Sequence, residues 1–172
     1  MRRTLLLPPL LAIACTYDPP DEEMTAQEQT EAGQPDRPAG SWETDPATGE
    51  TRARINTEDG TTTLVAGSQV VAQLPRGFTL YPGARILNTI NIGREEGRGV
   101  LLSMESDDPP ASLVDYYRRE AQAAGVEVDL DLTTGAMRMI GGQGGTIGNF
   151  AFQASREGGR TTGQLTVESG LN

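Results

Sequence analysis

The sequence contains no histidine and no lysine among its 172 residues, and it has a single cysteine. Without histidine, no side chain has an ordinary pKa near neutrality, so general base catalysis would need a carboxylate whose pKa is raised by burial. These absences also exclude a Ser-His-Asp triad, a zinc site made of His or Cys, a lysine Schiff base and an internal disulfide. We therefore predict no enzyme activity, no cofactor and no metal.

Positive charge is scarce as well. Acidic residues outnumber arginines by 24 to 14, which gives a net charge of −10 and predicts no nucleic-acid partner, because like charges repel. Residues 16–60 contain twelve acidic residues and three arginines, whereas residues 61–172 contain twelve and nine. The acidity therefore belongs mainly to the N-terminal part of the chain.

The first fifteen residues have the order of a secretory signal. Arg2 and Arg3 precede an apolar run at residues 5–11, and small residues lead to Cys15. The run is too short to cross a bilayer as a helix, which needs about 20 apolar residues. We interpret residues 1–14 as a signal peptide. Two kinds of signal peptide fit this order: one after which Cys15 carries a lipid, and an ordinary one that leaves Cys15 as a free thiol.

Residues 12–15 resemble the lipobox of bacterial lipoproteins, with Ala14 before the cleavage site and Cys15 as the modified residue. The resemblance implies two or three acyl chains, including palmitate, on Cys15, and two chains suffice for stable membrane anchoring. It also implies a periplasm-facing protein of the bacterial cell envelope. Thr16 after the cysteine favours the outer membrane over the inner, by resemblance to the enterobacterial sorting rule.

The segment that follows is acidic and rich in Pro, Gly, Thr, Glu and Gln, with almost no aliphatic residues up to residue 49. Such a segment buries too little apolar area to offset its conformational entropy, so we predict disorder. Residues 15–49 would then be a lipidated cysteine and a tether, and residues 50–172 a folded domain. Trp42 within this tether is either a docking residue for a partner or incidental.

The domain is predicted to comprise an N-terminal hairpin and connector at residues 50–73 and a core at residues 74–172. Asp59-Gly60 is a hairpin turn signal between two short strands in residues 51–65. Apolar residues then recur with a period of two in residues 86–105, which indicates half-buried strands.

A helix is predicted after Asp108, which suits the N-cap, with Pro109 at the first helical position. Gly125 suits the left-handed position that ends a helix. Apolar residues fall on one side of this helix and polar residues on the other, so we expect it to be amphipathic. The apolar side carries Leu113, Val114, Tyr117, Ala121 and Ala124.

Four more strands are predicted, at residues 126–132, 136–140, 149–155 and 161–168. Hydrophobic matching sets the register of the first pair, because a slip by one residue would expose two methionines. The expected cross-strand pairs are Leu132–Met137, Asp131–Arg138 and Leu130–Met139. One amphipathic helix on a mainly antiparallel sheet, preceded by a disordered acidic tether, is an α+β fold.

A longer pattern crosses the core. Leu74-Pro75, Phe78 and Tyr81-Pro82-Gly83-Ala84, with Tyr116-Tyr117 in a helix that ends Ala123-Ala124-Gly125, resemble a small domain of uncharacterised bacterial envelope lipoproteins. The resemblance implies an envelope location and assigns no functional residue. Its fold is loosely similar to the helix-on-sheet domains of lipoproteins that serve outer-membrane protein assembly, which by itself does not imply function.

Two acidic clusters and a glycine-rich segment have both a chemical and a structural interpretation. The cluster of Glu105, Asp107 and Asp108 could catalyse glycoside hydrolysis with a pair of carboxylates, or bind a hard cation. We favour the structural interpretation, in which these acidic residues lie at a helix N-terminus because the helix dipole stabilises them there. The cluster of Glu127, Asp129 and Asp131 suits weak calcium binding, but we favour a solvated face near Arg138. Residues 141–145 lack the Lys-Ser/Thr ending of a phosphate loop, so we interpret them as a turn.

Phe78, Tyr81 and Tyr117 are the candidate lining of a ligand pocket at the helix–sheet margin, with core packing as the alternative. We predict a lipid-anchored envelope protein with a non-enzymatic binding or scaffolding domain. Its partners would be the membrane, through Cys15, and envelope proteins or cell-wall components. The alternatives are a carboxylate-dependent hydrolase of envelope polysaccharide using Glu105 or Asp107, and a lipoprotein whose only partner is the membrane.

Overall fold

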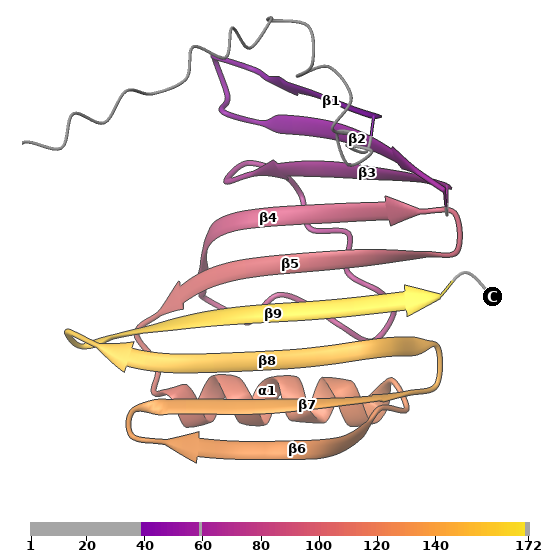
Figure 1. Ribbon diagram of the computed structural model, residues 1–172. Coiled ribbons are helices and arrows are strands. Elements are labelled where there is room, and N and C mark those ends of the chain that lie inside the picture. The colour runs from indigo at the N-terminus through magenta and orange to yellow at the C-terminus, as the bar shows by residue number, and fades with distance from the viewer. Residues whose placement is uncertain (1–38, 59, 171–172) are drawn as a thin grey trace, which may run out of the picture. The chain divides into compact units, whose positions relative to one another are not determined.

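The computed structural model describes residues 39–58 and 60–170 (Figure 1). The predicted signal peptide, Cys15 and the tether up to residue 38 lie outside these residues. No helix in the described part of the chain has the length and apolar content that a membrane crossing requires. The elements are β1 (Ala39–Thr44), β2 (Thr51–Thr57), β3 (Gly60–Gly67), β4 (Arg85–Arg94), β5 (Gly97–Ser106), α1 (Pro110–Ala123), β6 (Glu127–Thr134), β7 (Met137–Gly144), β8 (Ile147–Glu157) and β9 (Arg160–Gly170).

The nine strands form one antiparallel sheet in the order β1-β2-β3-β4-β5-β9-β8-β7-β6. Each strand pairs with the next one along the chain except β5 and β6, which α1 connects, and β9 lies between β5 and β8 (Figure 1). One helix accompanies this sheet, so the expected helix on an antiparallel sheet is confirmed, with sheet as the dominant part. β9 joins the five strands before α1 to the three that follow it.

The hairpin predicted around Asp59-Gly60 is present, because β2 pairs with β3 along its whole length. A strand that composition did not suggest, β1, precedes it and pairs with β2. Disorder was therefore the wrong prediction for residues 39–49. The carboxylate of Asp45 accepts a hydrogen bond from the Ala47 amide at 2.7 Å, and its carbonyl accepts one from the Gly49 amide at 2.8 Å. These bonds close the turn from β1 to β2.

Helix α1 begins one residue later than predicted. Pro109 is the N-cap, with an extended backbone, and Pro110 is the first helical residue. The assignment of Asp108 as the N-cap is wrong because Pro110 keeps the residue before it out of the helical region. At the other end, Gly125 has the predicted left-handed backbone, with φ +82°, and its amide donates to the Gln122 carbonyl.

The core lies between α1 and one face of the sheet. The helix contacts β6, β7, β8 and β9, and its buried residues are Leu113, Val114, Tyr117 and Ala121. Tyr117 packs on Phe152 with ring centroids 4.4 Å apart. The connector between β3 and β4 extends this cover. Asn91 of β4 holds it, donating to the Val71 carbonyl and accepting from the Gln73 amide, both at 2.9 Å.

The predicted register of β6 against β7 is wrong by two residues. Leu132 lies opposite Met139, and Met137 opposite Thr134. The reason is the turn, which contains only two residues and begins with Gly135 at φ +58°, the arrangement that favours glycine first in a tight hairpin. A shift of two residues keeps each side chain on its face of the sheet, so Leu132 and Met139 still share one.

The glycine-rich turn expected at residues 141–145 is largely a strand, because β7 continues to Gly144. Glycine is needed there because the neighbouring backbone lies too close to leave room for a Cβ atom. A Cβ at Gly142 would lie 1.9 Å from the Glu127 carbonyl oxygen, and one at Gly144 2.5 Å from the Gly125 carbonyl oxygen. The segment therefore lets β6 and β7 approach each other where their registers are irregular.

Candidate functional site

In residues 39–58 and 60–170, one face of the sheet is covered and the other is not. Helix α1 and the β3–β4 connector lie on the same face, and α1 is drawn behind β7 and β8 in Figure 1. No described element covers the opposite face, which we call the open face. Strand register assigns its large apolar residues, which are Trp42, Ile55, Leu64, Leu87, Ile90, Ile92, Leu101, Leu130, Leu132, Met137 and Met139.

In β4 the alternation places the polar residues toward the core. Thr89 is fully buried and Asn91 is 8 % exposed, whereas Ile90 and Ile92 lie half-buried on the open face. The hydroxyl of Thr89 has no hydrogen-bond partner among the residues that the structure describes. A period of two therefore indicated the strand correctly, but it did not indicate which face is the core.

One apolar part of the open face begins at the edge strand β1 and extends to β4. Trp42, Ala53, Leu64 and Ile92 are cross-strand neighbours on β1 to β4. Trp42 is 79 % exposed, and the other three are half-buried. Contiguous apolar side chains that water reaches are typical of interaction surfaces.

The middle of the open face is polar but uncharged. Gln153 of β8 donates to Gln164 of β9 at 2.9 Å between the side-chain amides. A cavity of about 320 Å³ lies beside them, and Met137 closes one side of it. This mixture of amides, hydroxyls and a thioether offers hydrogen bonds to a partner without a strong charge preference.

The three aromatic residues proposed as a pocket lining do not line one cavity among the described residues. Phe78 is 5 % exposed and packs on Phe150, and Tyr117 is fully buried. Tyr81 does line a shallow cavity of about 400 Å³, together with Asp108, Asp115, Tyr116 and Arg119 of the helix region. The structure thus places two of the three in the core.

Tyr81 is held at the helix margin by hydrogen bonds. Its hydroxyl donates to the Asp108 carboxylate at 2.7 Å, and its amide donates to the Tyr117 hydroxyl at 3.2 Å. Burial and the Asp108 carboxylate raise the pKa of Tyr81 to about 12, and burial raises the pKa of Tyr117. Both phenols therefore stay neutral at physiological pH, and they fasten the loop because the Tyr81 hydroxyl donates to Asp108 and the Tyr117 hydroxyl accepts from the Tyr81 amide.

Two carboxylates of the first acidic cluster, those of Glu105 and Asp108, have separate structural partners. Glu105 forms ion pairs with Arg85 and, at 3.3 Å, with Arg160. The hydrogen bond from Arg85 lowers the pKa of Glu105. Asp108 accepts the Tyr81 hydroxyl, and the carbonyl of Asp107 accepts from Arg156 at 3.1 Å. Within the described ranges, no three acidic residues gather as a metal site.

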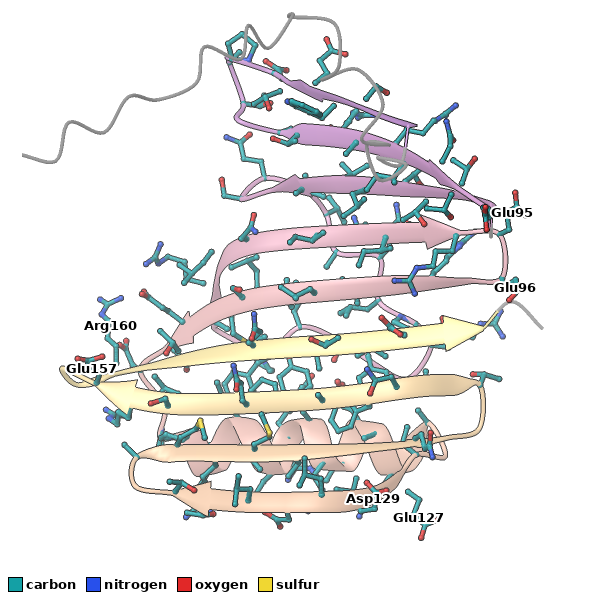
Figure 2. The ribbon with its side chains drawn as sticks, viewed as in Figure 1. Glu95, Glu96, Glu127, Asp129, Glu157 and Arg160 are labelled. Atoms are coloured by element: carbon teal, nitrogen blue, oxygen red, sulfur yellow. The ribbon has the colours of Figure 1, made fainter. Side chains whose placement is uncertain are left out.

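The second acidic cluster lies on the other edge strand. Asp131 is opposite Ile140, not Arg138, and its carboxylate pairs with Arg118 of α1 at 2.8 Å. Figure 2 shows Glu127 and Asp129 on β6, and both are exposed. Asp131 therefore contacts the helix, and Glu127 and Asp129 are exposed to solvent.

Comparison of the chain with protein-family models, curated proteins and solved structures finds no match. Function is therefore inferred from residues and geometry alone.

Proposed function

We propose that this chain is a lipid-anchored, periplasm-facing protein of the bacterial envelope whose domain binds or scaffolds envelope components without catalysis. Acyl chains on Cys15 would hold it in the membrane, the outer rather than the inner. The basic, apolar and small-residue regions before the only cysteine support this anchor. Residues 16–38 would serve as the disordered acidic tether, and an amphipathic α1 would turn its polar residues to water.

The open face is the observation that carries the binding role. Its apolar side chains are partly exposed, and covering them is favourable by roughly 25 cal/mol per Å² of apolar surface removed from water. Aliphatic side chains make poor partners for the hydroxyl groups of a polysaccharide. We therefore favour an envelope protein with an apolar surface as the partner on this face.

The hydrolase alternative has less support from the geometry. A general acid in a glycosidase needs a raised pKa. The ion pair with Arg85 instead lowers the pKa of Glu105. Glu105 is suited to remain an ionised partner of two arginines at the end of the sheet.

Intact-mass analysis of the natively produced chain tests the anchor. We expect cleavage before Cys15 and a mass increase equal to a thioether-linked diacylglycerol, with or without a third acyl chain. The Cys15→Ala variant should lose its membrane association. An unmodified thiol on the native chain, or a Cys15→Ala variant that still fractionates with membranes, contradicts the proposal.

Photo-crosslinking tests the open face. A benzoylphenylalanine at position 132 or 162 would project from the open face, and one at position 122 would project from the exposed side of α1. We expect discrete protein adducts from the two open-face positions in intact envelopes and none from position 122. Equal labelling from all three positions would mean that the open face is not the binding surface.

A further inference from the structure

The two edges of the sheet are unlike. The edge strand β6 carries Glu127 and Asp129 (Figure 2) as well as Asp131, and it has a bulge between Val128 and Leu130. Charges and bulges on an edge strand prevent pairing with another chain. This edge is therefore protected.

The other edge strand is less protected, because Glu43 is its single charged residue. β1 pairs with β2 over all six of its residues without a bulge, and it contains neither proline nor a basic residue. Its other side has no neighbouring strand among the described residues. Within the described ranges, its backbone groups on that side have no partner strand, which is the arrangement that β-strand addition uses.

An exposed tryptophan lies in the middle of this edge. Trp42 is 79 % exposed, and it lines a cavity of about 360 Å³ together with Ala53 and Leu64. A large aromatic side chain in this position contributes most to the free energy of binding when a partner covers it.

We propose that β1 pairs antiparallel with β1 of a second copy of this chain, across a twofold axis at Trp42, so that the two sheets become one. Such an axis is perpendicular to the sheet and brings identical surfaces together. The two Trp42 residues would lie opposite each other on the open faces. Ser41 of each copy would lie opposite Glu43 of the other. This pairing does not depend on the lipid anchor.

Charge complementarity is the reason to choose a second copy and this register. Arg54 of β2 is the cross-strand neighbour of Ser41, and it lies on the same face as Glu43. Neither Arg54 nor Glu43 forms an ion pair in the described part of the chain, where the pairs found are Arg52–Glu50, Arg85–Glu105, Arg94–Glu168, Arg118–Asp131 and Arg160–Glu105.

In the proposed pairing, Glu43 of one copy lies two strand spacings, about 10 Å, from Arg54 of the other at the backbone. The two long side chains can span that distance, so the twofold axis creates two equivalent ion pairs. An axis at Ser41 instead would place Glu43 opposite residue 39 and farther from Arg54. The charges therefore favour the axis at Trp42.

Cysteine cross-linking of the full chain in native membranes tests the register. Residues directly opposite each other have Cβ atoms about 5 Å apart, so the Trp42→Cys variant should form a disulfide-linked dimer under mild oxidation. A Ser41→Cys/Glu43→Cys double variant, which keeps Trp42, should also cross-link. With only one of these substitutions, the cysteines of the two copies would have their α-carbons about 8 Å apart. That distance is too long for a disulfide.

Charge reversal in the Trp42→Cys background tests the ion pairs. Glu43→Arg or Arg54→Glu alone should slow cross-linking about tenfold, because two equivalent pairs are lost at once. The double reversal should restore the rate. Glu96→Arg, in the turn between β4 and β5, is the matched control and should leave the rate unchanged.

The outcomes separate this proposal from the anchor. No dimer from Trp42→Cys or from the double-cysteine variant, or equal dimer from the single Ser41→Cys and Glu43→Cys variants, overturns the pairing. A wild-type chain that cross-links through Cys15 has a free thiol, which refutes lipidation. The β1 variants would then be tested with Cys15→Ser, and their result would still decide the pairing.

Discussion

The two faces of this sheet are made by the same strands, yet they have opposite relations to polarity. On β4 the covered face takes Thr89 and Asn91, and the open face takes Ile90 and Ile92. Local alternation therefore does not decide which face becomes the core. The position of α1 and of the β3–β4 connector decides it, and Asn91 is polar because it hydrogen-bonds that connector.

Adjacent leucines of β5 should give the largest difference between the faces. Leu102 is fully buried under the core, and Leu101 is half-buried on the open face. We expect Leu102→Ala to lower the free energy of unfolding by about 3 kcal/mol and Leu101→Ala by about 1 kcal/mol. Urea unfolding measures both. Equal losses would mean that the open face is covered as fully as the core.

Two asparagines of β4 form the next comparison. Asn91→Ala removes both bonds to the connector and should lower the free energy of unfolding by about 2 kcal/mol. Asn88→Ala, on the open face, should change it by about 0.5 kcal/mol or less. Amide exchange should also become faster at Gln73 in the first variant only. Unchanged exchange there would contradict the role given to Asn91.

Thr89 should respond in the opposite direction. Its hydroxyl is buried on the covered face without a hydrogen-bond partner in the described part of the chain. Replacement by valine keeps the shape and removes the unpaired group, so Thr89→Val should raise the free energy of unfolding by about 1 kcal/mol. The melting temperature should rise accordingly. A loss of stability would show that the hydroxyl has a partner, such as a bound water.

The smallest effect concerns pH at the end of the open face. Because the folded pKa of Glu105 lies below its ordinary value of 4.5, its ion pairs stabilise the fold above that pH and cease to do so as the pH falls. The wild-type chain should therefore be slightly more stable than Glu105→Gln at pH 7, and the difference should vanish in acid. Glu157→Gln, at the nearby end of β8, is the control (Figure 2). A difference that persists in acid would contradict this explanation.

Much of the fold could be predicted from short-range patterns. Asp59-Gly60 predicted the β2–β3 hairpin, and the apolar residues of the helix predicted its buried positions, including Tyr117. β1 was missed because it has no aliphatic residue larger than alanine. The sequence from Asp45 to Gly49 nevertheless contains the Asp, Pro and Gly typical of a turn and could have revealed it.

The candidate site was less predictable for a physical reason. The open face exists because α1 and the β3–β4 connector both lie on the same face of the sheet, and that placement is not a local property of the sequence. The register of β6 and β7 was missed because turn length, set by Gly135, outweighed the matching of apolar side chains. Cys15 was identified from pattern alone, and its lipidation stays a prediction.

The place of β9 has a consequence for how the domain is made. β9 lies near the middle of the sheet, yet it is synthesised after all the other described strands. The first five strands and the later three therefore cannot join one another until β9 is in place. Such distant pairings are slow to form. The domain is therefore complete only once its C-terminal β8–β9 hairpin has joined the two groups of strands.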